Sequence, residues 1–189
     1  MRSISRRYPR RRPRSEASVG VFSADRYVAS LELVNVDELV SQGIRLVLLD
    51  RDNTCVPRDA RMAPEGVRAW FSRARSAGLA LCLVSNNFHS RAVRASGEEL
   101  GCPSISRAMK PAPVAVWLAL VQNGVPPEQT VLIGDQVFTD VVSANLAGVR
   151  TILVRPQSRV DLWYTQILRL VEEPVLHGVR FDGEGDRPR

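Results

Sequence analysis

Four short clusters combine carboxylates, hydroxyls and one lysine in a way that suits chemistry on phosphate. In chain order they are Asp50-Arg51-Asp52-Asn53-Thr54, Ser85-Asn86-Asn87, Lys110-Pro111, and Gly134-Asp135 with Asp140 five residues on. Neighbouring carboxylates repel one another, and Mg²⁺ bound together with a substrate phosphate relieves that repulsion. A lysine and a hydroxyl hold further phosphate oxygens, and a carboxylate can attack phosphorus to give an aspartyl-phosphate. In the D-x-D pair, one aspartate suits the nucleophile and the other the general acid and base.

Each cluster taken alone also has an ordinary structural explanation. Asp50 and Asp52 suit a turn after a strand, and Ser85-Asn86-Asn87 suits a turn or a helix N-cap. Asp140 lies near an expected helix start, where the helix dipole favours an acid. The joint occurrence of all four clusters at the ends of expected elements favours the functional interpretation.

Lys110 is the only lysine among 26 basic residues. It comes just before an expected helix, where the dipole disfavours a cation. Local rules broken at a ligand-facing end often mark a functional site. We therefore expect its ammonium group within hydrogen-bonding reach of Asp50, where it would offset the charge of carboxylate and phosphate.

Short apolar runs alternate with amphipathic segments along the chain. This pattern predicts strands at 45–50, 79–84, 102–106, 130–133 and 150–154, and helices at 37–42, 64–77, 90–100, 111–121, 139–147 and 158–172. Apolar runs of this length are typical of strands buried on both faces. The alternation predicts an α/β fold, a parallel sheet with helices on both faces. Ligands of such folds bind outside the carboxyl ends of the strands, which is where the four clusters fall.

The composition is that of a soluble globular protein. Of 189 residues, 44% are apolar and 24% charged, and no apolar run approaches the ~18 residues of a membrane helix. Three cysteines without a C-x-x-C pair argue against a disulfide framework or a zinc site, so we expect a cytoplasmic protein. Two histidines far apart in sequence argue against histidine-based metal or triad chemistry.

The formal charge of +6 comes from one end of the chain. Residues 1–15 hold seven arginines and no acid, which leaves 19 basic and 20 acidic residues, a charge near −1, in the rest. We expect 1–15 to be a disordered tail, 16–44 a connecting segment, 45–175 the folded domain and 176–189 a C-terminal tail. No apolar stretch follows the arginines, so a signal peptide is not expected. The tail is either solvated or contacts an anionic surface, with lipid preferred to nucleic acid.

The clusters together resemble the four motifs of the haloacid dehalogenase (HAD) superfamily phosphatases, over about residues 25–155. The local words Asp-Asn-Thr-x-Val-Pro (52–57), Ser-Asn-Asn (85–87), Lys-Pro (110–111) and Gly-Asp-Gln-Val-Phe-Thr-Asp (134–140) are similar to the YqeG-like branch. That branch is related to the mitochondrial phosphatidylglycerophosphatases. The resemblance implies a Rossmann-like three-layer sandwich whose five parallel strands run in the order five-four-one-two-three.

The resemblance also implies a role for each site residue. Asp50 would be the nucleophile and a Mg²⁺ ligand, and Asp52 the general acid and base with its backbone carbonyl on the metal. Lys110 would stabilise charge at the nucleophile. The phosphoryl group would be contacted by Thr54, Ser85 and Asn86, while Asp135 would ligate Mg²⁺ and Asp140 would support that site.

Two positions depart from the branch pattern, and we assign neither a role in the chemistry. Arg51 stands where an apolar residue is common, and Cys55 where leucine is common. Cys55 suits a small buried apolar residue.

The spacing of the motifs bears on the substrate. Thr54 and Ser85 are 30 residues apart and Ser85 and Lys110 are 24 apart, counting the residues between them, which leaves no room for a domain-sized cap. An open site suits a phosphate on something large, and the branch resemblance makes phosphatidylglycerophosphate the leading substrate. The apolar stripe of 158–172, Val160 to Val171, is expected to face the sheet, with membrane contact at the inner membrane surface as the alternative.

Two other functions compete with this one. The first is a phosphatase for a small soluble phosphate, with an oligomer closing the site. The second is a non-catalytic module that binds nucleic acid or protein through the basic tail. The complete motif set argues against the second, because a binding module has no need of Asp50, Asp52, Lys110 and Asp135 together.

Overall fold

The structure, a computed structural model, describes residues 20–158, 176 and 178–184. Its described part is a six-stranded parallel sheet in the order β1-β6-β5-β2-β3-β4. The strands are β1 Arg26–Val28, β2 Leu46–Leu49, β3 Ala80–Val84, β4 Ser104–Ile105, β5 Thr130–Gly134 and β6 Arg150–Val154. The helices are α1 Val36–Ser41, α2 Glu65–Ser76, α3 Ser90–Leu100, α4 Val114–Asn123 and α5 Val142–Ala147. The predicted α/β class is confirmed.

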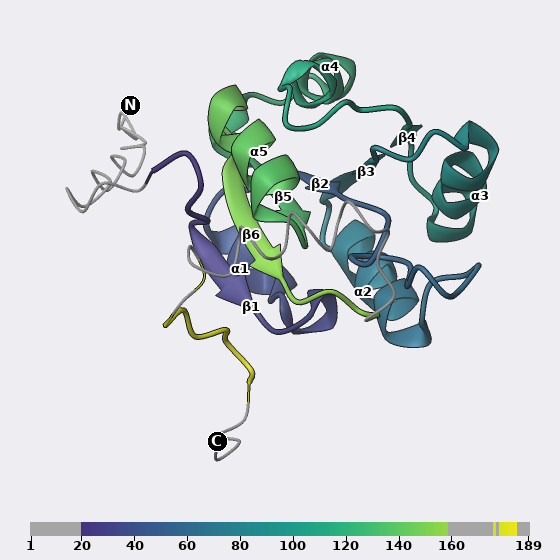
Figure 1. Cartoon of the computed structure of the whole chain (residues 1–189), viewed down its shortest axis with the longest axis horizontal. Helices are drawn as coiled ribbons and strands as arrows, with labels where there is room; N and C mark the ends of the chain where they lie inside the picture. Colours follow the sequence, from purple (N-terminus) through teal and green to yellow (C-terminus); the bar gives the residue numbers. More distant parts are fainter. Residues whose placement is uncertain (1–19, 159–175, 177, 185–189) are drawn as a thin grey trace, which may run out of the picture.

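Helices cover both faces of the sheet (Figure 1). Successive residues of β2 point to opposite faces, so Val47 and Leu49 pack in a core with α1 and α2 while Leu46 and Leu48 pack with α4 and α5. All four β2 side chains are buried. This two-sided burial is why the central strands have continuous apolar runs, as expected for a parallel sheet.

The predicted number of five strands is wrong, because the structure adds β1 at the edge of the sheet. The five expected strands keep the order expected of them, and β1 pairs with β6 in the register Arg26 to Ile152. The strand lies within 16–44, which we expected only to connect. Its three residues, Arg-Tyr-Val, are too few to show a period, so only pairing with β6 defines it.

Part of the expected C-terminal tail packs against this edge strand. Phe181 is buried and its ring meets that of Tyr27 edge-on, with 5.5 Å between centroids. Asp182 forms a β-bridge with Val28. The expected N-terminal tail 1–15 and the expected helix 158–172 lie outside the described residues, apart from Ser158.

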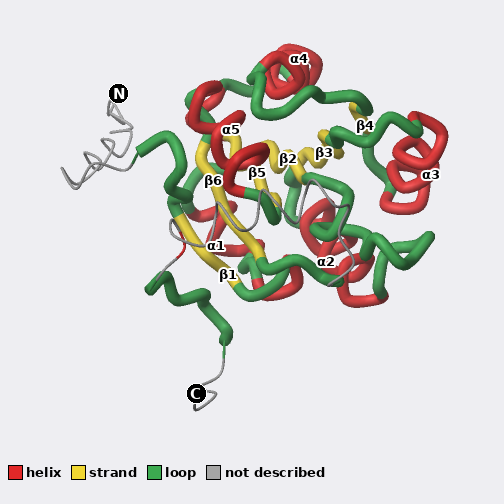
Figure 2. The backbone as a smooth tube through the Cα atoms, viewed as in Figure 1, coloured by secondary structure: helices red, strands yellow, loops and turns green. Residues whose placement is uncertain are grey.

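The expected helix 139–147 begins earlier and in two parts. A π-helical turn, η3 Val137–Val141, leads directly into α5 (Figure 2). Wide turns of this kind are frequent at functional sites, and this one carries Asp140 on its inner side, where the side chain is buried.

The three cysteines are free thiols. Cys55 is fully buried, as expected of a small apolar residue, and burial raises the pKa of its thiol well above the ordinary value. Burial likewise raises the pKa of Cys82 to about 12 and that of Cys102 to about 11. None of the three is a thiolate at neutral pH, so none has the form that reacts.

Candidate active site

The four sequence clusters meet at the carboxyl edge of the central strands. Strands β2 and β5 are neighbours, with Leu49 opposite Ile133, and the amide of Asp50 donates to the carbonyl of Ile133 at 2.9 Å. Asp50 and Asp135 therefore extend from adjacent strand ends. This placement follows from the parallel pairing, because parallel strands end at one edge of a sheet.

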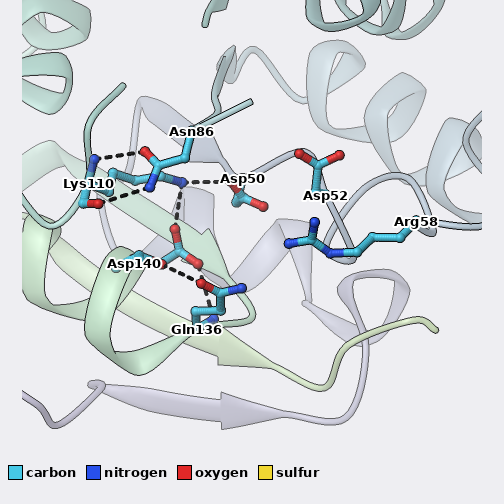
Figure 3. A pocket seen from close by; sticks show the side chains of 8 residues that line it. Asp50, Asp52, Arg58, Asn86, Lys110, Gln136 and Asp140 are labelled. Carbon is cyan, nitrogen blue, oxygen red and sulfur yellow. Dashed lines mark hydrogen bonds and ion pairs between the residues drawn. The ribbon is translucent and has the colours of Figure 1, made fainter. Parts of the chain in front are cut away.

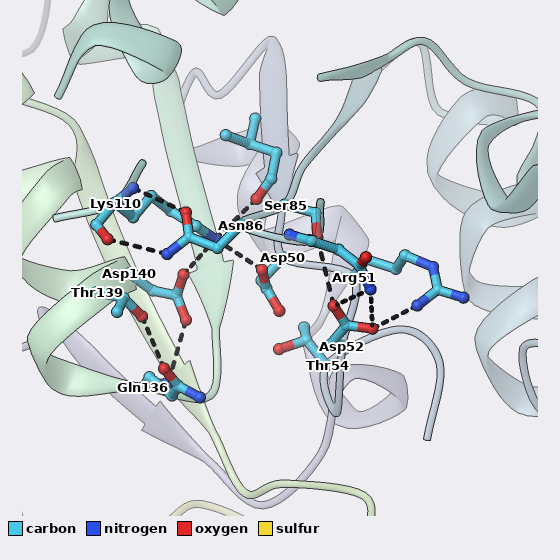
Figure 4. A network of polar contacts seen from close by, with 12 residues as sticks. Asp50, Arg51, Asp52, Thr54, Ser85, Asn86, Lys110, Gln136, Thr139 and Asp140 are labelled. Carbon is cyan, nitrogen blue, oxygen red and sulfur yellow. Dashed lines mark hydrogen bonds and ion pairs between the residues drawn. The ribbon is translucent and has the colours of Figure 1, made fainter. Parts of the chain in front are cut away.

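Lys110 is buried at the centre of the site, with all three ammonium protons used (Figure 4). Its Nζ donates to Asp50 Oδ1 at 2.7 Å, to Asp140 Oδ1 at 2.6 Å and to the carbonyl of Val84 at 2.7 Å. Burial alone would lower the pKa of Lys110, but the Asp140 and Asp50 carboxylates outweigh it and raise that pKa. The expected contact between Lys110 and Asp50 is confirmed.

Asn86 positions the backbone of Lys110. Its side-chain Nδ2 donates to the Lys110 carbonyl at 2.9 Å, and the Lys110 amide donates to Asn86 Oδ1 at 2.8 Å (Figure 3). We expected this side chain on the phosphate, but here both ends of its amide are engaged by the lysine. The contact of Asn86 with phosphate stays a prediction.

Asp50, Asp135 and Asp140 form a buried acidic cluster. One carboxylate oxygen from each lies within 4.8 Å of the others. Burial raises the pKa of Asp50 to about 8; Lys110 opposes that rise, and the carboxylates of Asp140, Asp135 and Asp52 add to it. Three carboxylates and one ammonium leave a formal charge of −2 when all are ionised, so the site favours a further cation.

This cluster offers the type of ligand that a Mg²⁺ site requires. Mg²⁺ prefers carboxylate oxygens and binds through one or two of them together with a substrate phosphate. The expected ligands were Asp50, Asp52 and Asp135, with Asp140 in support. In the structure Asp140 belongs to the cluster itself, while the Asp52 side chain points to a separate group of partners. We expected the backbone carbonyl of Asp52 to bind the metal, and the direction of the Asp52 side chain does not affect that expectation.

Gly134 makes room for Asp140. A Cβ atom at Gly134 would lie 2.3 Å from Asp140 Cγ, closer than any real contact. The carboxylate of Asp140 also accepts from the Gln136 amide at 3.1 Å, which fixes it over the end of β5. The glycine of the Gly-Asp motif is thus needed for the close approach of an acid to the strand.

We expect Gly134→Ala to lower the free energy of unfolding by about 1–3 kcal/mol, the usual cost of overpacking. It should also lower turnover sharply, because the displaced carboxylate is one that holds Lys110. Urea unfolding and phosphatase assays measure the two effects. Gly20→Ala is the control, since a Cβ there meets no atom within 4 Å. Unchanged stability and turnover in Gly134→Ala would contradict this account of the glycine.

Asp52 is held by a different set of side chains (Figure 4). Asn87 Nδ2 donates to Asp52 Oδ2 at 3.1 Å, Ser85 Oγ approaches the same oxygen at 3.5 Å, and Arg51 forms an ion pair with Oδ1. Arg51 is itself anchored by its Nε on Ser96 Oγ at 2.8 Å. This anchoring keeps Asp52 beside Asp50 but away from Lys110.

Sequence reasoning assigned no role to Arg51 or Asn87, although both hold Asp52. For Arg51, the sequence signal that could have indicated a role was its departure from the branch pattern, which commonly has an apolar residue at that position. Thr54 and Ser85 are both buried, and Thr54 Oγ1 donates to Asp135 Oδ1 at 3.3 Å. Their expected contact with the phosphoryl group stays a prediction. The structure brings all the predicted site residues together.

A pocket of about 260 Å³, including space open to solvent, lies over these groups (Figure 3). It is lined by Asp50, Asp52, Arg58, Asn86, Lys110, Gln136, Thr139 and Asp140. Sequence reasoning gave no role to Arg58, Gln136 or Thr139. Gln136 and Thr139 lie within the 134–140 motif, and Thr139 belongs to the π-helical turn η3, whereas Arg58 follows β2 in a loop. Because this volume includes space open to solvent, the enclosed part is small, and it suits a small polar group whose carrier stays outside.

Comparison with known proteins finds relatives of the chain. A family model described as HAD-hydrolase-like matches residues 107–159. The chain is 33% identical to the probable phosphatase YqeG of Bacillus subtilis over 162 residues, 86% of this chain and 94% of that protein. It is 25% identical over 135 residues to the mitochondrial phosphatidylglycerophosphatase GEP4 of Saccharomyces cerevisiae, 65% of this chain and 72% of that protein.

Solved structures share the fold. A hypothetical protein from Xanthomonas campestris aligns with a TM-score of 0.52 and 17% identity, covering 74% of this chain and 78% of that one. A protein from Listeria monocytogenes aligns with a TM-score of 0.50 and 15% identity, covering 71% and 98%. The structural matches establish the architecture, and the 33% identity over nearly the whole of YqeG establishes the family. The chain therefore belongs to the HAD superfamily and, within it, to the YqeG-like phosphatase family.

Proposed function

We propose that this protein is a Mg²⁺-dependent phosphomonoester hydrolase that works through an aspartyl-phosphate on Asp50. The observation that carries the proposal is the buried ammonium of Lys110 between Asp50 and Asp140, with Asp135 in the same cluster. A buried group of three acids and one lysine is costly to fold. An ordinary structural role would not account for it, whereas phosphoryl transfer uses each member.

The residues present suit a two-step reaction. Asp50 attacks phosphorus and forms an acyl phosphate, while the leaving alkoxide takes a proton from Asp52. Asp52 then takes a proton from water, whose oxygen attacks the same phosphorus and frees Asp50 and inorganic phosphate. Asp52 suits both steps because Asn87, Ser85 and Arg51 orient it beside Asp50. Lys110 offsets the charge of Asp50 and of the phosphoryl oxygens throughout.

The metal would be held by Asp50, Asp135 and Asp140, with the backbone carbonyl of Asp52 as an expected further ligand. Bound there, Mg²⁺ would reduce the repulsion between phosphate and carboxylate and draw charge from the phosphoryl oxygens. Thr54 would keep Asp135 in place through the hydrogen bond from its hydroxyl.

The open pocket supports a substrate whose phosphate is attached to a large carrier. Residues 55–84 hold only α2 and β3 with their loops, and 86–109 hold only α3 and β4, so neither segment forms a cap domain. We propose phosphatidylglycerophosphate, because the matched yeast protein is named for that activity. Work on such a lipid would place the protein at the inner surface of a membrane, as a peripheral protein in the cytoplasm. Among the described residues, no helix is long and apolar enough to cross a membrane.

One observation favours a second candidate, a phosphatase for a small soluble phosphate closed by another copy of the chain. Helix α4 exposes an apolar stripe of Val114, Trp117, Leu118 and Val121, which a second copy would cover. This stripe carries no charged residue, and it does not explain how a second copy bound there would close the pocket. We therefore prefer the lipid substrate.

Purified protein should hydrolyse phosphatidylglycerophosphate with Mg²⁺ and lose that activity in EDTA. Mg²⁺ alone should raise the melting temperature, because it neutralises the acidic cluster. Asp135→Asn should abolish that rise, and Asp59→Asn, an exposed acid outside the cluster, should keep it. Hydrolysis that is indifferent to EDTA would contradict the metal. A preference for soluble phosphates over the lipid would favour the second candidate.

A further inference from the structure

We propose that one rim of the pocket docks on an anionic lipid surface. The rim is made of two exposed apolar side chains and three exposed arginines: Phe88, Arg91, Arg94, Arg107 and Met109. Docking there would serve the proposed function and rests on it, although binding to lipid does not itself require turnover.

The rim belongs to two loops that are bonded to each other at the active site. The Asn86 side chain and the Lys110 backbone exchange two hydrogen bonds, and the Arg107 amide donates to the Asn87 carbonyl at 3.2 Å. Phe88 follows Asn87 directly and Met109 precedes Lys110. Both side chains are therefore next to residues of the site, and Figure 3 shows Asn86 and Lys110 side by side.

The two apolar members of the rim are exposed to an unusual degree. Phe88 is 72% and Met109 73% exposed, and among the large apolar side chains of the described part only Val121, at 79%, is more exposed. Neither side chain lines the pocket, so neither is explained by contact with the phosphate. Large apolar side chains beside cations are what surface-bound proteins bury at the boundary of head groups and acyl chains.

The arginines give the rim a positive charge. Arg91 and Arg94 are three residues apart, so they share the exposed side of the first turns of α3, and Arg107 lies on the adjoining loop. Within the described residues none of the three forms an ion pair. Elsewhere on the surface arginines do pair with acids, as Arg73 does with Asp37.

The nearest acids in sequence lie toward the C-terminal end of α3, one helical turn or more from the rim arginines. Between residues 86 and 113 the only acids are Glu98 and Glu99, at the far end of α3. Glu98 lies seven positions after Arg91, about 10 Å along the axis, but only four positions after Arg94, on the same side of α3. Glu99 faces Arg68, at 3.6 Å. Glu98 therefore offsets part of the charge of Arg94, while Arg91 and Arg107 remain available to attract anionic head groups, each arginine adding to the attraction.

The position of the rim explains why docking would serve catalysis. The helix α3 begins at the carboxyl edge of the sheet, where the pocket opens, so a surface that touches the rim also faces the pocket. A phosphate on a lipid head group would then reach Lys110 and Asp50 without leaving the membrane. The apolar stripe of α4 is a weaker candidate for contact with anionic lipid, because no residue from 111 to 127 is charged.

Cosedimentation of the full chain with vesicles tests the proposal without any substrate. Vesicles of phosphatidylcholine mixed with phosphatidylglycerol should bind the protein, and vesicles of phosphatidylcholine alone should bind it much less. Phe88→Ser with Met109→Ser should weaken binding to the mixed vesicles at least tenfold. Arg91→Glu with Arg94→Glu should weaken it as much and should reduce its dependence on salt.

A matched control separates the rim from exposed apolar surface in general. Val121 and Leu146 are exposed apolar residues on α4 and α5, and Val121→Ser with Leu146→Ser should leave binding unchanged. The residues 1–15 are common to every protein compared, so their charge cannot produce a difference. Circular dichroism verifies folding, and the rim variants should keep wild-type turnover of a soluble chromogenic phosphate.

The outcomes are distinct. Weaker vesicle binding in both rim variants, with the control unaffected, supports the docking face even if the protein hydrolyses no phosphate, in which case the proposed function fails alone. Wild-type binding in both rim variants overturns the docking face even if the enzyme is active. Equal weakening in the control overturns it too. A change from dimer to monomer in the rim variants at unchanged vesicle binding would make the rim an interface between copies instead.

Discussion

Asp50→Asn should reduce turnover of any phosphomonoester by at least about 10³-fold, the scale on which removal of a nucleophile acts in other hydrolases. The amide has nearly the shape of the carboxylate but cannot form the acyl phosphate. Rapid quenching of the wild type with a labelled substrate should trap label on the protein in near-stoichiometric amount, and the variant should trap none. Steady-state assays at matched purity give the loss of turnover.

The variant should stay folded, which makes its loss of activity interpretable. Burial raises the pKa of Asp50 to about 8, above its unfolded value, so in metal-free buffer the ionised carboxyl costs stability as the pH rises from about 4 to about 8. Asparagine does not titrate and removes that cost, although it also removes one partner of Lys110. We therefore expect melting temperatures of variant and wild type to be similar at neutral pH. Asp59→Asn serves as the surface control, and substantial turnover by Asp50→Asn would sink the assignment of the nucleophile.

Lys110→Met should damage both the fold and the chemistry. The ammonium group donates to Asp50 and Asp140 at 2.7 and 2.6 Å, and all three side chains are buried. Removing one partner of a buried ion pair leaves a buried charge uncompensated, which typically costs about 3–5 kcal/mol of stability. The loss of a preorganised cation should lower kcat by a further factor of about 10²–10³. Urea unfolding and steady-state kinetics measure the two effects.

Lys110→Arg separates charge from geometry. It keeps the positive charge, but the guanidinium is a planar fork, whereas this site uses three donors from one nitrogen toward Asp50, Asp140 and the Val84 carbonyl. We expect stability between those of wild type and Lys110→Met, and turnover well below that of wild type. Full turnover in Lys110→Arg would mean that the site needs only a charge there, and wild-type stability in Lys110→Met would mean that the ion pairs contribute nothing net.

The central part of the fold was readable from the sequence because its signals are local. The β2 and β3 strands are apolar runs buried on both faces, and α3 has the expected bounds, Ser90–Leu100, ending at Gly101. The edge of the sheet was not readable. Three residues of β1 carry no periodic pattern, and Phe181 is buried against Tyr27 only because the chain returns to that edge from more than 150 positions away.

The candidate site, like the fold, could be predicted from the sequence only in part. Its chemical groups could be predicted from the amino-acid sequence, as could the position of each group after a strand or before a helix. The apolar runs that define those ends are also the residues that bury the sheet. Which of these groups become partners depends on the folded arrangement of the strands. Lys110 reaches Asp50 across 60 positions and Asp140 across 30, Gly134 lets Asp140 into the acidic cluster, and Arg51 draws the Asp52 side chain aside. These choices depend on strand register and on contacts of a few ångströms in a close-packed interior, where a shift of one side chain displaces the next.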